Sequence, residues 1–129
     1  MRTKTLLAHK KLWLTLAVAW TLLIAVLCLV SFNKLPTVKI AGADKYVHAV
    51  FHFVFTLLWF AYLRIGTPRP LLKVFVGSLA YGALMEVLQG VMTTTRQADM
   101  ADIMANLFGA TVAVLIILTT MRYAPVRSN

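Results

Sequence analysis

The amino-acid sequence predicts an all-α, polytopic membrane protein, a four-transmembrane-helix bundle with both termini cytoplasmic. The chain has 129 residues, of which 60% are hydrophobic and 13% are charged. Its apolar residues gather in four segments, each close to the roughly 20 residues that cross a hydrocarbon core of about 30 Å. The connections between these segments are short, so we predict a single membrane domain over residues 1–129.

The first apolar segment, residues 12–32, is the clearest because it contains no charged residue. Basic residues precede it, as they also precede the apolar run of a signal peptide: Arg2, Lys4, Lys10 and Lys11. The run is longer than is usual in a signal peptide, and no small-residue cleavage site follows it. We therefore predict that this segment is an uncleaved anchor.

The other three apolar segments carry polar residues in their interiors. They are residues 47–63, 74–92 and 103–121. The first of them contains two histidines, the second contains Glu86 and Gln89, and the third contains Asn106. Ionisable and amide groups inside a membrane are costly, so their presence requires an explanation.

The distribution of basic residues predicts the orientation of the helices. With the N-terminus inside, the 13 Lys and Arg residues divide nine to four in favour of the inner side. We therefore predict a multi-pass membrane protein with both termini on the inner side. The formal net charge of +9 is then explained by inner loops next to anionic lipids, so the expected partners are membrane lipids and not nucleic acid.

This topology brings the polar residues of three helices to the outer side of the membrane. Within each segment they recur at helical spacing and form one stripe. A polar pocket that opens outward would allow Glu86 to avoid facing lipid. The candidate pocket consists of Asp44, Lys45, His48, Glu86, Gln89, Arg96, Asp99, Asp102 and Asn106.

Small residues indicate where the helices pack closely. Gly109 and Ala113 lie four residues apart in the last segment, and Gly82 lies one turn before Glu86. Small residues at this spacing allow helix backbones to approach each other. Four short helices bury little surface from lipid, so a homo-oligomer is a further possible arrangement.

Three motifs resemble the VanZ-like family of small bacterial integral membrane proteins. They are Asp44-Lys45-Tyr46-Val47-His48, then Gly82-x-x-x-Glu86-x-x-Gln89, then Arg96-x-x-Asp99-x-x-Asp102-x-x-x-Asn106-x-x-Gly109. The resemblance covers residues 44–113. The resemblance implies a location in the bacterial cytoplasmic (inner) membrane. The founding member of the family is associated with low-level resistance to the glycopeptide teicoplanin, so the resemblance also implies a role in the cell envelope and in antibiotic resistance. The chain departs from the family at His52, where an aromatic residue is common, and at Ala113, where a second glycine often follows.

These observations favour a binding function, with two alternatives left open. The leading hypothesis is that the pocket binds or modulates an envelope lipid, a lipid-linked precursor or a glycopeptide. Lys45 and Arg96 among four carboxylates suit a zwitterionic or glycosylated headgroup. The first alternative is an acid/base or metal-assisted enzyme that acts on a lipid-linked phosphate or glycolipid, with Glu86 shuttling a proton. The second is a structural or accessory protein that has no ligand.

Two residue patterns bear on the enzyme alternative. His48 and His52 face one way and could bind a metal with Glu86 or Asp102, but a lone H-x-x-x-H motif is weakly specific. We therefore predict no metal and no cofactor, and we expect His52 to pack at the membrane interface. Ser78 is expected to have no histidine nearby, which argues against a serine nucleophile.

Overall fold

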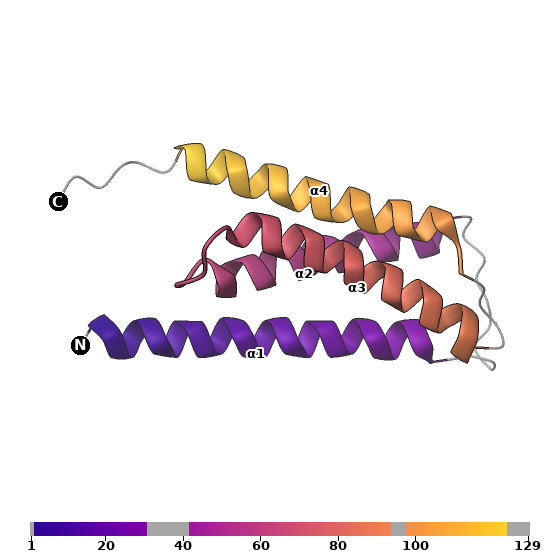
Figure 1. Ribbon diagram of the computed structural model, residues 1–129, viewed down its shortest axis with the longest axis horizontal. Helices are drawn as coiled ribbons and strands as arrows, with labels where there is room; N and C mark the ends of the chain where they lie inside the picture. Colours follow the sequence, from indigo (N-terminus) through magenta and orange to yellow (C-terminus); the bar gives the residue numbers. More distant parts are fainter. Residues whose placement is uncertain (1, 31–41, 94–97, 124–129) are drawn as a thin grey trace.

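The computed structural model describes residues 2–30, 42–93 and 98–123, and it contains four helices (Figure 1). They are α1 (Arg2–Leu29), α2 (Ala43–Leu63), α3 (Pro70–Met92) and α4 (Met100–Tyr123). α1 and α4 lie at opposite edges of the bundle with α2 and α3 between them, and the first turn of α1 lies at the same end as the last turn of α4 (Figure 1). The predicted all-α fold is confirmed.

Each of the four helices is long and apolar enough to cross a membrane. The apolar stretches are Thr5–Leu29, Ala43–Leu63, Pro70–Met92 and Met100–Arg122. The shortest has 21 residues and is about 31 Å long at a rise of 1.5 Å per residue, which matches the hydrocarbon core. By helix length and hydropathy, the chain is therefore a multi-pass membrane protein.

The bounds of α1 differ from those predicted. The helix begins at Arg2 and ends at Leu29, whereas the predicted apolar segment covers residues 12–32, of which 31 and 32 lie outside the described residues. Lys and Arg are good helix formers, so the helix continues through the basic residues that a hydropathy criterion excludes. The other three predicted segments lie within their helices, which extend beyond them by at most four residues at either end.

The distribution of apolar and polar residues is the reverse of that in a soluble protein. Large apolar side chains lie on the outside, with 61% of Leu22, 60% of Val87 and 66% of Phe108 exposed. Ionisable side chains lie inside, with 3% of His48 and 1% of Glu86 exposed. A surface of this kind is suited to hydrocarbon, and the interior provides the polar contacts that lipid cannot.

Small residues bring α2 and α4 together, and this pair makes the most extensive helix contact in the bundle. A Cβ atom on Gly109 would overlap the carbonyl oxygen of Ala49 and would lie 3.0 Å from its Cα. Ala110 and Ala113, on the same helix, are fully buried. Only glycine therefore allows the two backbones to approach at this position.

Hydrogen bonds and apolar contacts attach α1 to the bundle. Ile24 and Cys28 of α1 pack in one apolar cluster with Phe55 of α2 and Met85 of α3. Four hydrogen bonds connect α1 with α2 and α3: Trp20 Nε1 to Phe51 O, Trp59 Nε1 to Thr21 Oγ1, Tyr81 Oη to Thr21 O, and Gln89 Nε2 to Cys28 O. α1 contacts α2 and α3, and within the described residues it makes no contact with α4.

Candidate functional site: a buried polar cluster

Four polar side chains from three helices meet inside the bundle. They are His48 of α2, Glu86 of α3, and Asp102 and Asn106 of α4, and we call them the polar cluster. Between 1% and 7% of each residue is exposed. Asp102 and Asn106 are four residues apart and share one face of α4, which is why both reach the same position.

His48 lies between the two carboxylates of the polar cluster. Its Nδ1 donates a hydrogen bond to Asn106 Oδ1 at 3.2 Å and lies 3.5 Å from Glu86 Oε1. Its Nε2 lies 3.7 Å from Asp102 Oδ2. An amide oxygen only accepts hydrogen bonds, so Nδ1 carries a proton and Nε2 is the nitrogen that faces Asp102.

Three polar atoms of the cluster accept or donate no hydrogen bond among the described residues. They are Glu86 Oε1, Asp102 Oδ1 and Asn106 Nδ2. The second oxygen of Glu86, Oε2, accepts the backbone N–H of Asp99 at 3.2 Å, which ties α3 to the start of α4. A buried polar atom without a hydrogen bond costs about 1–3 kcal/mol, so three at one place need an explanation other than stability.

A rim of three charged residues, Asp44, Lys45 and Asp99, lies between the polar cluster and the surface. Lys45 Nζ lies 3.4 Å from an oxygen of Asp44, 3.4 Å from one of Asp99 and 3.8 Å from Asp102 Oδ1. The rim side chains are nearly half-exposed, whereas that of Asp102 is only 10% exposed. Asp102 therefore connects the rim to the buried cluster, and a continuous polar path extends from the end of the bundle to Glu86.

Asp99 precedes α4 and stabilises its first turn. One of its carboxylate oxygens accepts the backbone N–H of Ala101 at 2.8 Å. This hydrogen bond, together with the nearby Lys45 ammonium, holds the pKa of the Asp99 carboxyl below its usual value. Asp99 therefore carries a negative charge at neutral pH and keeps Lys45 at the rim.

Two of the nine residues predicted for the pocket are not part of this arrangement. Gln89 points to α1, where its Nε2 donates to the carbonyl oxygen of Cys28 at 3.0 Å. Arg96 lies outside the described residues. The other seven form the polar cluster and the rim, at one end of the bundle.

The structure shows that the prediction for Ser78 was wrong. His52 Nδ1 and Ser78 Oγ form a hydrogen bond of 2.8 Å, and both residues are buried. The prediction that His52 packs at the membrane interface was wrong as well, because it lies near the middle of α2 with 1% of its surface exposed. Gly82 makes room for this arrangement, since a Cβ there would lie 3.0 Å from the His52 ring and 2.8 Å from Asn106 Nδ2.

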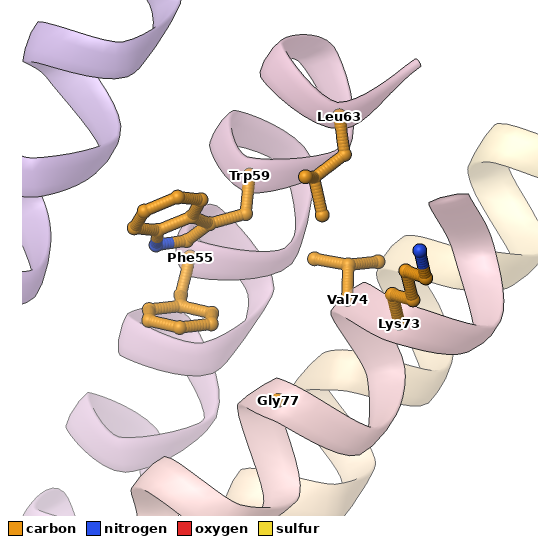
Figure 2. Close-up of a pocket in the computed structure, with 6 residues that line it drawn as sticks. All are labelled: Phe55, Trp59, Leu63, Lys73, Val74 and Gly77. Atoms are coloured by element: carbon orange, nitrogen blue, oxygen red, sulfur yellow. The ribbon is translucent and has the colours of Figure 1, made fainter. Parts of the chain in front are cut away.

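A separate hollow lies between α2 and α3, toward the end of the bundle opposite the rim. It has a volume of about 200 Å³ and is shown in Figure 2. Its lining consists of Phe55, Trp59, Leu63, Lys73, Val74 and Gly77. Apart from Lys73 the lining is apolar, and it includes no residue of the polar cluster or the rim.

Comparison with known proteins does not extend these findings. No family model matches the chain, and neither a curated protein nor a solved structure matches it. What the geometry establishes is a small polytopic membrane protein with a buried cluster of His, Asp and Glu side chains.

Proposed function

We propose that this chain is a VanZ-like protein of the bacterial cytoplasmic membrane that binds the polar headgroup of an envelope lipid or lipid-linked precursor. The observation that carries the proposal is that three buried atoms of the polar cluster make no hydrogen bond among the described residues: Glu86 Oε1, Asp102 Oδ1 and Asn106 Nδ2. They offer two hydrogen-bond acceptors and one donor. A headgroup with hydroxyl or ammonium donors and at least one acceptor oxygen satisfies all three.

The rim favours a headgroup that carries both a positive and a negative charge, or one that carries several sugar hydroxyls. Lys45 stands among three carboxylates, so a simple anion gains one attractive partner and meets three repulsive ones. An ammonium or a hydroxyl group can approach the carboxylates while Lys45 contacts a phosphate. The motifs within residues 44–113 resemble those of the VanZ-like family, which adds a glycopeptide, itself rich in hydroxyl and ammonium groups, as a second ligand for the same site.

Removal of the Glu86 charge is expected to abolish lipid retention. In native mass spectrometry of gently extracted protein, the wild-type chain should carry a lipid adduct that Glu86→Gln lacks, because the amide replaces a carboxylate acceptor of the buried cluster. Tyr81→Phe is the control: it deletes a partly buried hydrogen bond to Thr21 outside the cluster, so the adduct should persist. Equal adducts on wild type and Glu86→Gln would contradict the proposal.

The proposed orientation places the rim on the outer side of the cytoplasmic membrane. In a Cys28→Ala background, a membrane-impermeant maleimide added to intact cells should label Ala98→Cys, which lies on the rim side and is exposed. Thr67→Cys, in the connection between α2 and α3 at the opposite end, should react only after the cells are permeabilised. The reverse pattern would place the polar cluster on the cytoplasmic side and rule out a ligand from the outer leaflet.

A further inference from the structure

We infer that His48, Glu86 and Asp102 form a binding site for one divalent transition-metal ion, with Zn²⁺ as the ion to test. This inference goes beyond headgroup binding and does not depend on it. One ligand atom from each of the three residues lies within 4.8 Å of the other two, and all three residues are buried. The histidine pair that the sequence offered is not the site, because His52 hydrogen-bonds to Ser78 instead.

The distances between these side chains are suitable for a single ion. Ligand atoms about 2.0–2.2 Å from a tetrahedral Zn²⁺ lie roughly 3.3–3.5 Å from one another. Because His48 Nδ1 donates to Asn106, an ion would bind His48 at Nε2, which lies 3.7 Å from Asp102 Oδ2. One ligand atom from each of the three residues lies within 4.8 Å of the other two. An ion on Nε2 requires the Glu86 carboxylate to move toward that nitrogen, since the 3.5 Å distance in the structure joins Glu86 Oε1 to Nδ1.

Hydrogen bonds from neighbouring groups orient His48 and Glu86, as is usual for the side chains that bind a metal ion. A histidine that binds a metal typically donates its other N–H to a protein oxygen, and His48 Nδ1 donates to Asn106 Oδ1. Asp99 N–H occupies Glu86 Oε2, which leaves Oε1 available. The two unpartnered carboxylate oxygens, Glu86 Oε1 and Asp102 Oδ1, are atoms that a bound cation would satisfy.

Charge balance also favours a divalent ion. Two carboxylates and one neutral imidazole around a doubly charged cation give a net charge of zero, which is the least costly state inside a membrane. A protonated His48 would neutralise only one of the two buried carboxylates. Lys45 approaches Asp102 Oδ1 at 3.8 Å, but it is nearly half-exposed and is shared with Asp44 and Asp99.

The chemical types of the ligands narrow the choice of ion. Imidazole nitrogen suits Zn²⁺, Cu²⁺, Fe²⁺ and Ni²⁺, whereas carboxylate oxygen also suits Mn²⁺. The described cluster offers no thiolate, which disfavours the softest ions. Three protein ligands leave at least one coordination position open, as in zinc sites where a water molecule or a substrate oxygen completes the sphere.

Direct measurement of bound metal tests the site. Protein without a histidine tag, stripped with a chelator in mild detergent and then dialysed against Zn²⁺, should retain one ion per chain by elemental mass spectrometry. Co²⁺ should replace it and give the visible absorption bands of a low-symmetry, four- or five-coordinate ion. Asp102→Asn and His48→Gln should lose the ion, whereas Asp44→Asn and His9→Gln, which change the same residue types outside the cluster, should retain it.

Asn106 provides a positioning test that does not remove a ligand. Asn106→Leu should weaken metal affinity by about 10- to 100-fold, because it deletes the acceptor that orients His48. Wild-type protein that retains no stoichiometric Zn²⁺ or Co²⁺ overturns the inference, as does an ion that persists in His48→Gln. The wild-type result decides the matter even if a variant fails to fold.

The metal and the headgroup proposals can fail separately. A metal-loaded chain that carries no lipid adduct refutes headgroup binding alone. A chain that carries a lipid adduct but retains no metal ion after dialysis against Zn²⁺ refutes the metal site alone.

Discussion

Replacement of Gly109 with alanine is expected to prevent α2 and α4 from packing, whereas the same replacement at Gly77 is expected to leave the bundle intact. The new Cβ at residue 109 would overlap the carbonyl group of Ala49, which is backbone and cannot rotate away. At residue 77 the Cβ would meet nothing within 4 Å. Overpacking of a well-filled interior costs about 1–3 kcal/mol, and a clash with backbone lies at the upper end of that range.

The two alanine variants form a matched pair because the chemical change is identical. The measurement is the midpoint of thermal unfolding in detergent, together with the fraction of protein that elutes as a single monodisperse peak. Gly109→Ala should lower both, and Gly77→Ala should resemble wild type or exceed it slightly, since alanine is the better helix former. If both variants behaved alike, the close approach of α2 and α4 would be refuted.

The fold could be predicted from the sequence because a membrane leaves few options. Four apolar segments of about 20 residues must form helices, since a backbone in hydrocarbon satisfies its own hydrogen bonds only in that way or in a closed barrel. The positions of the helix ends could not be predicted as well. α1 extends to Arg2 because helical hydrogen bonding continues past the point where apolar residues end.

The polar cluster could also be predicted in large part. His48, Glu86, Asp102 and Asn106 come together because each lies on its helix at a similar distance from the rim, and charge inside a membrane turns away from lipid. Gln89 was misplaced for a geometric reason. It lies three residues after Glu86, about 60° around the helix, and this rotation turns it toward α1 and the carbonyl of Cys28.

The His52–Ser78 hydrogen bond was missed although the sequence contains a signal for it. Ser78, Gly82 and Glu86 are spaced four residues apart and share one face of α3, just as His48 and His52 share one face of α2. The two faces meet along their length, so a deeper polar pair lies below the cluster. The depth of Ser78 along α3 does not reveal this contact, because its partner His52 lies across the interface on α2.

The polar cluster is not expected to stabilise the folded protein. A buried polar network that is only partly satisfied is less favourable than an apolar core of the same shape. The cluster retains three unpartnered atoms among the described residues. A polar cluster of this kind is expected where its residues serve binding and not folding. Variants whose stability and binding are measured separately test this expectation.

Replacement of His48 alone is expected to destabilise the protein strongly. Replacement of His48, Glu86 and Asp102 together is expected to restore stability. His48→Leu leaves the Glu86 and Asp102 carboxylates buried without the imidazole that lies 3.5 Å from one and 3.7 Å from the other. Removing one member of a buried charged group in this way costs about 3–5 kcal/mol. The triple variant, in which His48, Glu86 and Asp102 are all leucine, removes the unpaired charges and should unfold near or above the wild-type midpoint.

Unfolding midpoints measured in detergent with a chelator present compare the proteins without any bound ion. His9→Leu is the control for the loss of a histidine, because His9 is exposed and bonds only to a carbonyl of its own helix. If the triple variant were as unstable as His48→Leu, the cluster would contribute to folding and the structural alternative would gain support. A triple variant that is stable but carries neither lipid nor metal would show that these residues act in binding, since their removal would leave the fold intact and abolish only the site.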